Sequence, residues 1–192
     1  PVLCLTWETP VSWVASVETH LPDVLIDHAH CERKAAGAAM SMLFTYADDP
    51  ALVSPLRAII DEELAHLEEV IALLSARKIP LKRLKPSHYA GRLHALARKT
   101  EPDRYIDLCL IAGLIEARSC ERFALLRDHL KDHHLAQFYG NLFESEARHY
   151  MTYVALAKLR ADSETIKERL SQLALCEGEI VAESDGLPRL HS

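Results

Sequence analysis

Hydrophobic residues recur at steps of three and four along five long stretches of the chain, a spacing that is typical of amphipathic helices. Short breaks containing Pro, Asp or Ser separate these stretches. The pattern predicts four long helices and a fifth that packs outside them. Their approximate ranges are 22–46, 54–77, 102–130, 132–159 and 163–182, with a short additional helix near 89–97.

The links between the predicted helices are unequal in length. Short links join the first long helix to the second and the third to the fourth, whereas residues 78–99 form one long link in the middle. Two helical hairpins joined by a crossover make a four-helix bundle. We therefore expect an all-α protein with a single domain over 1–192, a bundle core at about 22–159 and an extra C-terminal helix at about 163–182.

Composition agrees with this class and excludes several others. Hydrophobic residues make up 49% of the 192 positions, and six Gly and nine Pro are few for a sandwich or barrel. No apolar run approaches the roughly 20 residues of a membrane-spanning helix, and the first residues do not resemble a secretory leader. Five widely spaced cysteines without a Cys-x-x-Cys pair argue against a disulfide framework or zinc ribbon. We expect a cytoplasmic protein with no membrane partner.

Charge is distributed unevenly along the chain. The formal net charge is -6, yet residues 70–100 contain no Asp or Glu and carry eight Lys and Arg. A localised positive face on an acidic protein indicates a polyanionic partner, and a solvated loop is the alternative interpretation. We call residues 78–99 the basic crossover.

Two of the predicted helices carry a Glu-x-x-His pair on their apolar stripe. Glu63 and His66 lie in one pair, and Glu146 and His149 lie in the other. Because residues three apart share one face of a helix, both members of each pair face the expected core. A single pair of this kind is a weak signal, and two pairs in register are a much stronger one.

Each of the remaining two bundle helices places one lone Glu on its stripe. Glu32 precedes Glu63 by 31 residues, and Glu116 precedes Glu146 by 30, so two hairpins of equal geometry would bring all six side chains to one height. Four buried carboxylates lose hydration and repel one another, and bound cations remove that conflict. Four carboxylates with two imidazoles suit two iron or manganese ions better than structural zinc.

Other polar residues compete with these six. Glu62 precedes His66 by four residues, and Glu121 lies on a neighbouring face, about 140° around the helix from Glu116. Whether either joins or replaces a predicted ligand stays open. His28 and His30, shortly before Glu32, are either supporting residues or surface residues.

Four segments surround the predicted ligands: HCERKAA at 30–36, DEELAH at 61–66, LIEARSCERF at 114–123 and ESEARHY at 144–150. Together they resemble the MiaE family of bacterial tRNA hydroxylases, within the ferritin-like di-iron carboxylate superfamily, and the resemblance covers nearly the whole chain. It implies oxygen-dependent hydroxylation of the isopentenyl group on a 2-methylthio-N6-isopentenyl-adenosine next to the tRNA anticodon. Carried over residue by residue, it implies the iron ligands Glu32, Glu63, His66, Glu116, Glu146 and His149.

The resemblance also implies cofactors and partners. Two non-haem iron ions and dioxygen are expected, and an external reductase or ferredoxin must deliver electrons because the sequence has no flavin, nicotinamide or iron-sulfur motif. The basic crossover becomes the expected tRNA contact, with His88 and Tyr89 available to stack on a base. Four basic residues near the ligand segments are expected either to line an entrance or to form salt bridges; they are Arg33, Lys34, Arg118 and Arg122. The expected tRNA-binding side chains are Lys78, Lys82, Arg83, Lys85, Arg92, Arg98 and Lys99.

The alternative hypothesis is a ferritin-like ferroxidase, peroxidase or iron-handling protein without an RNA substrate. It explains the six ligands equally well, but it gives the acid-free stretch no specific purpose.

Overall fold

The computed structural model describes residues 2–183 and 186–191, and every regular element among them is a helix. The expected all-α class is therefore confirmed for the part of the chain that the structure describes. The helices in chain order are α1 (Ser12–Thr19), α2 (Leu21–Thr45), α3 (Val53–Ala76), α4 (Tyr89–Ala95), α5 (Asp103–His129), α6 (His133–Ala157) and α7 (Ser163–Ala182).

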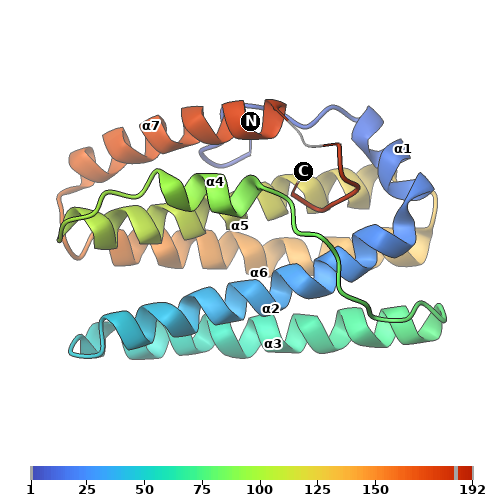
Figure 1. Cartoon of the computed structure of the whole chain (residues 1–192), viewed down its shortest axis with the longest axis horizontal. Helices are drawn as coiled ribbons and strands as arrows, with labels where there is room; N and C mark the ends of the chain where they lie inside the picture. The colour runs from blue at the N-terminus through green and yellow to red at the C-terminus, as the bar shows by residue number, and fades with distance from the viewer. Residues whose placement is uncertain (1, 184–185, 192) are drawn as a thin grey trace. The chain divides into compact units, whose positions relative to one another are not determined.

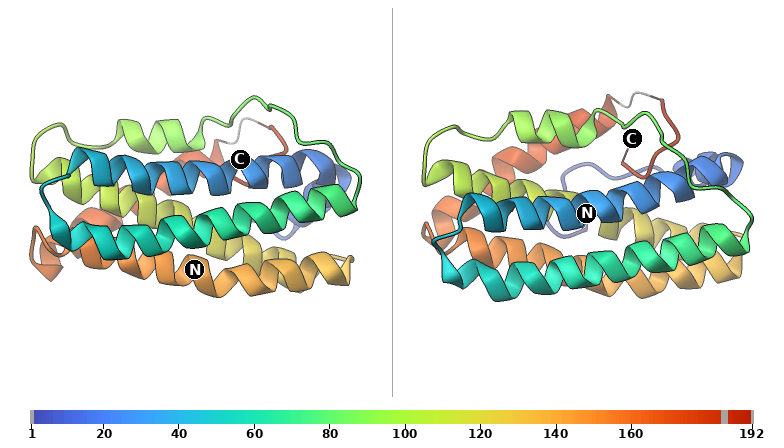
Figure 2. Two further views of the ribbon diagram at one scale, coloured as in Figure 1. Left: turned by 90° about the horizontal axis from the view of Figure 1, so that it is seen from below. Right: turned by 60° about the horizontal axis from the view of Figure 1, so that its bottom comes forward.

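Helices α2 and α3 form the first hairpin and pack side by side (Figures 1 and 2). A Pro in the first turn of α2 suits the start of a helix, because the missing N–H would have no helical acceptor there. Between the two helices, a 3-10 turn at Pro50–Leu52 is capped by Asp49, whose side chain accepts a hydrogen bond from the Ala51 N–H. Both helices begin and end within one residue of the predicted bounds.

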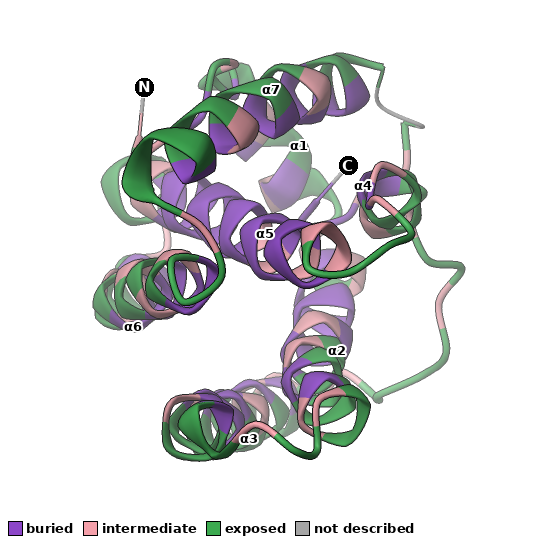
Figure 3. Cartoon of the chain, turned by 90° about the vertical axis from the view of Figure 1, so that its left-hand side faces the viewer, coloured by how far each residue is buried: buried purple, intermediate pink, exposed green. Residues whose placement is uncertain are grey.

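Helices α5 and α6 form the second hairpin and pack along each other (Figure 1). The short link between them ends at Asp132, whose carboxylate accepts hydrogen bonds from the backbone N–H groups of His134 and Leu135. This cap satisfies donors that have no partner inside the first turn of α6. The burial pattern in Figure 3 shows that α5 is buried along most of its length, whereas α3 keeps a broad exposed face.

The remaining helices add to the second hairpin. Helix α7 packs against α5 and α4, and α4 also contacts α5. The short helix expected near 89–97 and the C-terminal helix expected at 163–182 are both present as α4 and α7. Helix α1 was not predicted, because only Val14 and Val17 of its eight residues are buried and so short a segment gives no repeating stripe.

The chain divides into two compact units. The α2–α3 unit contains residues 19–86 and 188–190, and the α5–α6 unit contains the described part of 1–18, 87–187 and 191–192. A single domain over 1–192 stays a prediction. Among the described residues, no helix is both long enough and apolar enough to cross a membrane.

Candidate metal centre

The α2–α3 unit gathers three of the predicted ligands in its core. Glu32 comes from α2, and Glu63 and His66 come from successive turns of α3. One potential ligand atom from each lies within 4.8 Å of the others, and His66 Nδ1 is 3.9 Å from a carboxylate oxygen of both Glu32 and Glu63. All three are buried, and Glu63 is completely inaccessible to solvent. The grouping predicted from sequence spacing is therefore present in this unit.

His28 lies one turn before Glu32 and holds its carboxylate. The His28 Nε2–H donates a hydrogen bond to Glu32 Oε1, and both side chains are buried. Burial lowers the pKa of His28 to about 4, so the imidazole is neutral at physiological pH. His28 is thus a supporting residue and not a surface residue, which settles the choice that the sequence left open.

The α5–α6 unit gathers the other three predicted ligands. Glu116 comes from α5, and Glu146 and His149 come from α6, with one potential ligand atom of each within 4.8 Å of the others. Burial raises the pKa of Glu116 above its ordinary value, and a hydrogen bond with Glu146 partly offsets that rise.

Each unit therefore holds two buried carboxylates and one buried imidazole close together. Removing such charged groups from water is costly unless a cation or proton compensates them. Hard carboxylate oxygens combined with imidazole nitrogen suit iron or manganese in the divalent state. Both triads fit a metal-binding role by their donor chemistry, and the assignment of the individual ligands stays a prediction.

The competing carboxylates have other surroundings. Glu121 accepts hydrogen bonds from the backbone N–H of Thr9 at 2.6 Å, from the Thr9 hydroxyl at 2.8 Å and from Arg118 at 3.0 Å. Its carboxylate is thereby committed to a structural contact. Glu62 is half-buried beside the fully buried Glu63. Neither observation favours a replacement of Glu63 or Glu116.

A buried polar cluster in the α5–α6 unit was not anticipated. Arg118 is fully buried and donates to both oxygens of Glu177 on α7, at 2.8 and 2.7 Å. The Tyr89 hydroxyl donates to the same carboxylate at 2.9 Å. Glu177 lies seven residues after Leu170 on the buried stripe of α7, so an inward Glu was a signal that the sequence did offer.

This cluster decides the roles of three residues. Tyr89 is buried and stacks on His191, so the expectation that it stacks on an RNA base is wrong. Arg122 is also buried, with its guanidinium 4.7 Å from the centre of the Trp13 ring. Together with Arg118, it supports the packing of α5 and does not line an entrance.

The expected tRNA-binding side chains differ in what they contact. Arg98 pairs with Asp103 at 3.0 Å and with Asp107 at 2.9 Å, and Arg92 pairs with Glu183 at 2.7 Å. Lys82 lies 3.1 Å from Asp23. The other four are exposed and form no ion pair within the described part of the chain; they are Lys78, Arg83, Lys85 and Lys99. A tRNA contact by these seven residues stays a prediction.

Comparisons with known proteins agree on one family. The model of the family described as tRNA-(MS[2]IO[6]A)-hydroxylase (MiaE) matches residues 2–192. A relative from Pseudomonas putida, named tRNA 2-(methylsulfanyl)-N(6)-isopentenyladenosine(37) hydroxylase, is 38% identical over 96% of this chain and 89% of its own length. A relative of the same name from Salmonella typhimurium is 31% identical over 96% of this chain and 86% of its own.

A solved structure is also similar over the full length. It is described as protein 43 with aldehyde deformylating oxygenase activity from Synechococcus, with a TM-score of 0.95 and 45% identity, covering 100% of this chain and 96% of that one. This similarity confirms the expected ferritin-like fold class. With a family match from residue 2 to residue 192, the chain belongs to the MiaE family.

Proposed function

We propose that the protein is a non-haem di-iron monooxygenase that hydroxylates the isopentenyl side chain of 2-methylthio-N6-isopentenyl-adenosine next to the anticodon in tRNA. Membership of the MiaE family over residues 2–192 is the observation that carries this proposal. Two relatives that each match 96% of the chain bear the name of such a hydroxylase. Because tRNA is the substrate, we also propose a cytoplasmic location.

The two triads are the proposed ligands of two iron ions. Glu32, Glu63 and His66 would hold metal on the α2–α3 side, and the second triad would hold it on the α5–α6 side. In each unit, two carboxylates and one imidazole are the proposed metal donors. When bound, iron supplies the electron transfer that reduces dioxygen, a reaction for which amino-acid side chains alone have no capacity.

The protein's own residues orient the ligands and exclude water. His28 fixes one oxygen of Glu32 through a neutral imidazole, which leaves the second oxygen of that carboxylate for a metal. Leu142 lies one turn before Glu146 and Tyr153 one turn after His149, and both are buried. Glu146 and His149 therefore have buried neighbours on both sides along α6. Exclusion of water by these neighbours strengthens electrostatic interactions within the site.

The electrons come from outside the chain in this proposal. Insertion of one oxygen atom from dioxygen into a C–H bond, with the other oxygen leaving as water, requires two electrons and two protons. An external reductase or ferredoxin is the proposed source. The basic crossover is the proposed contact for the phosphates around the modified nucleotide.

The test is a reaction with the complete substrate. Iron-loaded, reduced protein is incubated with dioxygen and tRNA that carries the prenylated, methylthiolated adenosine, and the digested nucleosides are analysed by mass spectrometry. The expected result is one added oxygen on the isopentenyl group, and its loss in Glu63→Gln. A full, redox-active di-iron site that adds no oxygen would overturn the proposal and favour the ferroxidase or iron-handling alternative.

A second candidate function is favoured by one observation. The Synechococcus protein is 45% identical and is described as having aldehyde deformylating oxygenase activity. The same iron-loaded protein is therefore incubated with an aldehyde, and released formate is measured. Formate production without oxygen transfer to tRNA would favour this second candidate.

A further inference from the structure

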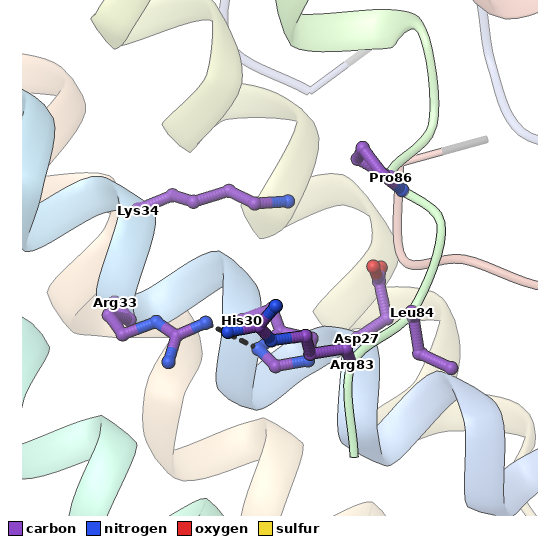
Figure 4. Close-up of a pocket in the computed structure, with 7 residues that line it drawn as sticks. All are labelled: Asp27, His30, Arg33, Lys34, Arg83, Leu84 and Pro86. Atoms are coloured by element: carbon purple, nitrogen blue, oxygen red, sulfur yellow. Dashed lines mark hydrogen bonds between the residues drawn. The ribbon is translucent and has the colours of Figure 1, made fainter.

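An open pocket of about 240 Å³ lies on the α2–α3 unit, between α2 and the first part of the basic crossover (Figure 4). Three of its seven lining side chains are permanent cations. Its other walls are the carboxylate of Asp27, the ring of His30 and the apolar Leu84 and Pro86. The cations are Arg33 and Lys34, from α2, and Arg83, from the crossover.

The negative charge inside the pocket is already compensated. Asp27 lies 3.6 Å from the Arg189 guanidinium and accepts a hydrogen bond from the Leu190 N–H at 2.9 Å. Arg189 also donates twice to the Lys85 carbonyl, at 2.9 and 3.1 Å, which holds the crossover against residues 188–190. Asp27 therefore does not neutralise the three lining cations, and the pocket keeps a net positive charge.

The position of Arg33 is fixed by a chain of hydrogen bonds. Arg33 donates to His30 Nδ1 at 2.9 Å (Figure 4). His30 Nε2 in turn donates to the Lys82 carbonyl at 2.8 Å. The imidazole thus links α2 to the crossover and positions the guanidinium at the pocket. A positioned guanidinium loses little side-chain entropy when it binds an anion, and its planar donors match phosphate.

The other two cations have charge to offer to a ligand. Lys34 and Arg83 are exposed, and within the described residues neither side chain forms an ion pair or a hydrogen bond. In this they differ from Lys82, Arg92 and Arg98, whose charges are taken up by carboxylates of the chain. A surface that pairs some basic residues but leaves a cluster of three around a hollow is suited to a bound anion.

The pocket lies close along the chain to the proposed metal site. Arg33 directly follows Glu32, so their Cα atoms are about 3.8 Å apart. Arg33 is exposed, whereas Glu32 is buried. An anion held by the Arg33 guanidinium therefore lies on the outer side of the same helical turn that carries a proposed iron ligand. A nucleotide whose base points toward the core would leave its backbone phosphate at the surface of this turn.

We propose that this pocket binds one backbone phosphate at or next to the target adenosine of tRNA, with Arg33, Lys34 and Arg83 as its cationic groups. This inference rests on the proposed function, because tRNA is its ligand. The phosphate contact fixes the position of the nucleotide, and the three cations act before any chemistry occurs.

The test combines neutralised cations with a neutralised phosphate. Full-length Arg33→Gln, Lys34→Gln and Arg83→Gln are compared with Lys167→Gln, a charge-matched control on the exposed face of α7. Binding of tRNA is measured over a salt series. Each pocket variant is expected to bind roughly tenfold more weakly and to lower the slope of log affinity against log salt by about one. The control is expected to change neither quantity.

The phosphate is then identified by chemical synthesis. Anticodon stem–loops that carry a single neutral methylphosphonate on either side of the target adenosine are bound to the wild type and to Arg83→Gln. One methylphosphonate should weaken wild-type binding about as much as Arg83→Gln does, and should have no further effect on that variant. Additive losses at both positions would overturn the proposal.

Two further outcomes distinguish a failure of the pocket proposal from a failure of the proposed function. If inorganic phosphate binds the wild type but not the pocket variants, and no methylphosphonate couples to the cations, the pocket takes free phosphate and the RNA assignment is wrong. If the wild type hydroxylates tRNA while all three pocket variants keep wild-type affinity and salt slope, the proposed function stands and the pocket proposal is overturned. Because the side chains of Lys34 and Arg83 make no hydrogen bond within the described residues, their variants test the idea even if Arg33→Gln perturbs folding.

Discussion

The two hairpins present the same three donor types at nearly the same sequence spacing, yet they hold the lone Glu in different ways. In α2, His28 lies four residues before Glu32 and donates a hydrogen bond to it. In α5, the equivalent position is Ala112, and Glu116 instead shares a hydrogen bond with Glu146. One carboxylate is thus held by a neutral donor and the other by a second carboxyl group. The repeat in sequence determines which donors are present, and their neighbours determine how each is held.

The hairpins also differ in what fastens them to the rest of their unit. Helix α5 takes part in two ionic contacts that involve a buried carboxylate: Asp107 with Arg98 and Arg169, and Arg118 with Glu177. Helix α2 contributes Asp27, which contacts residues 189 and 190 near the C-terminus. We infer that α5 carries more of the polar stabilisation, whereas α2 carries the surface that faces the proposed substrate.

The largest expected effect comes from breaking the buried cluster on α5. Arg118→Met leaves Glu177 and Glu121 buried without their cation, and the free energy of unfolding should fall by about 3–5 kcal/mol. The midpoint of urea unfolding measures the change. Arg57→Met is the matched control on α3, because Arg57 forms an exposed pair with Asp61, and exposed pairs contribute at most about 1 kcal/mol. Equal losses in the two variants would contradict the comparison.

Metal binding tests the ligand assignment in the two triads. Glu63→Gln and Glu146→Gln each remove a charged donor with little change in volume, one from each hairpin. Both should lower hydroxylation more than about a hundredfold, and both should leave fewer than two iron ions per chain. The metal-free variants should be at least as stable as the metal-free wild type, because one buried charge is gone. Iron analysis and thermal unfolding measure the two quantities, and two retained irons in either variant would argue against the ligand assignment.

His28 tests the asymmetry itself. His28→Ala should weaken iron binding by about 10- to 100-fold, because Glu32 loses the donor that orients it. Ala112→Ser alters the equivalent position on α5 and should change iron affinity little. Iron titration of the apoprotein measures both. An unchanged affinity in His28→Ala would show that the histidine is only a packing residue.

The smallest expected effect concerns Asp107 and acid. Burial alone would raise its pKa, but hydrogen bonds from Arg169 and Arg98 outweigh burial and lower the pKa to about 2. A lowered pKa in the folded state means that the contribution to stability is complete above the unfolded pKa, near 4, and is lost as pH falls towards 2. Asp107→Asn should cost about 1–2 kcal/mol at neutral pH, allowing for the partial exposure of Arg98. Urea unfolding from pH 7 down to pH 2 should show the two proteins converging.

Much of the fold and the candidate site could be predicted because both depend on helical periodicity. An apolar residue every three or four positions marks the buried stripe, and a Glu or His on that stripe must share the burial. This is why Glu32, Glu63 and His66 are found together in one unit, and Glu116, Glu146 and His149 in the other. The helix bounds could also be predicted, because Pro and Asp favour helix starts through local backbone effects.

The roles of the basic and aromatic residues could not be predicted in this way. Arg98, Arg118 and Tyr89 look from the sequence like candidates for a substrate contact, yet each is engaged by a carboxylate far along the chain or on another helix. For Arg33 and Lys34, the sequence left open whether they line an entrance or form salt bridges. Their meeting with Arg83 around a pocket depends on how the crossover passes α2.

The sequence by itself determined the helical class, the two hairpins and the six buried donors, because these follow from the local 3.6-residue repeat of the helix. The tertiary structure alone decided which charged side chains form ion pairs inside the protein and which remain available to a ligand. The physical reason is that ion pairing and desolvation depend on distances between atoms that are remote in sequence, as between Arg118 and Glu177 or Asp27 and Arg189.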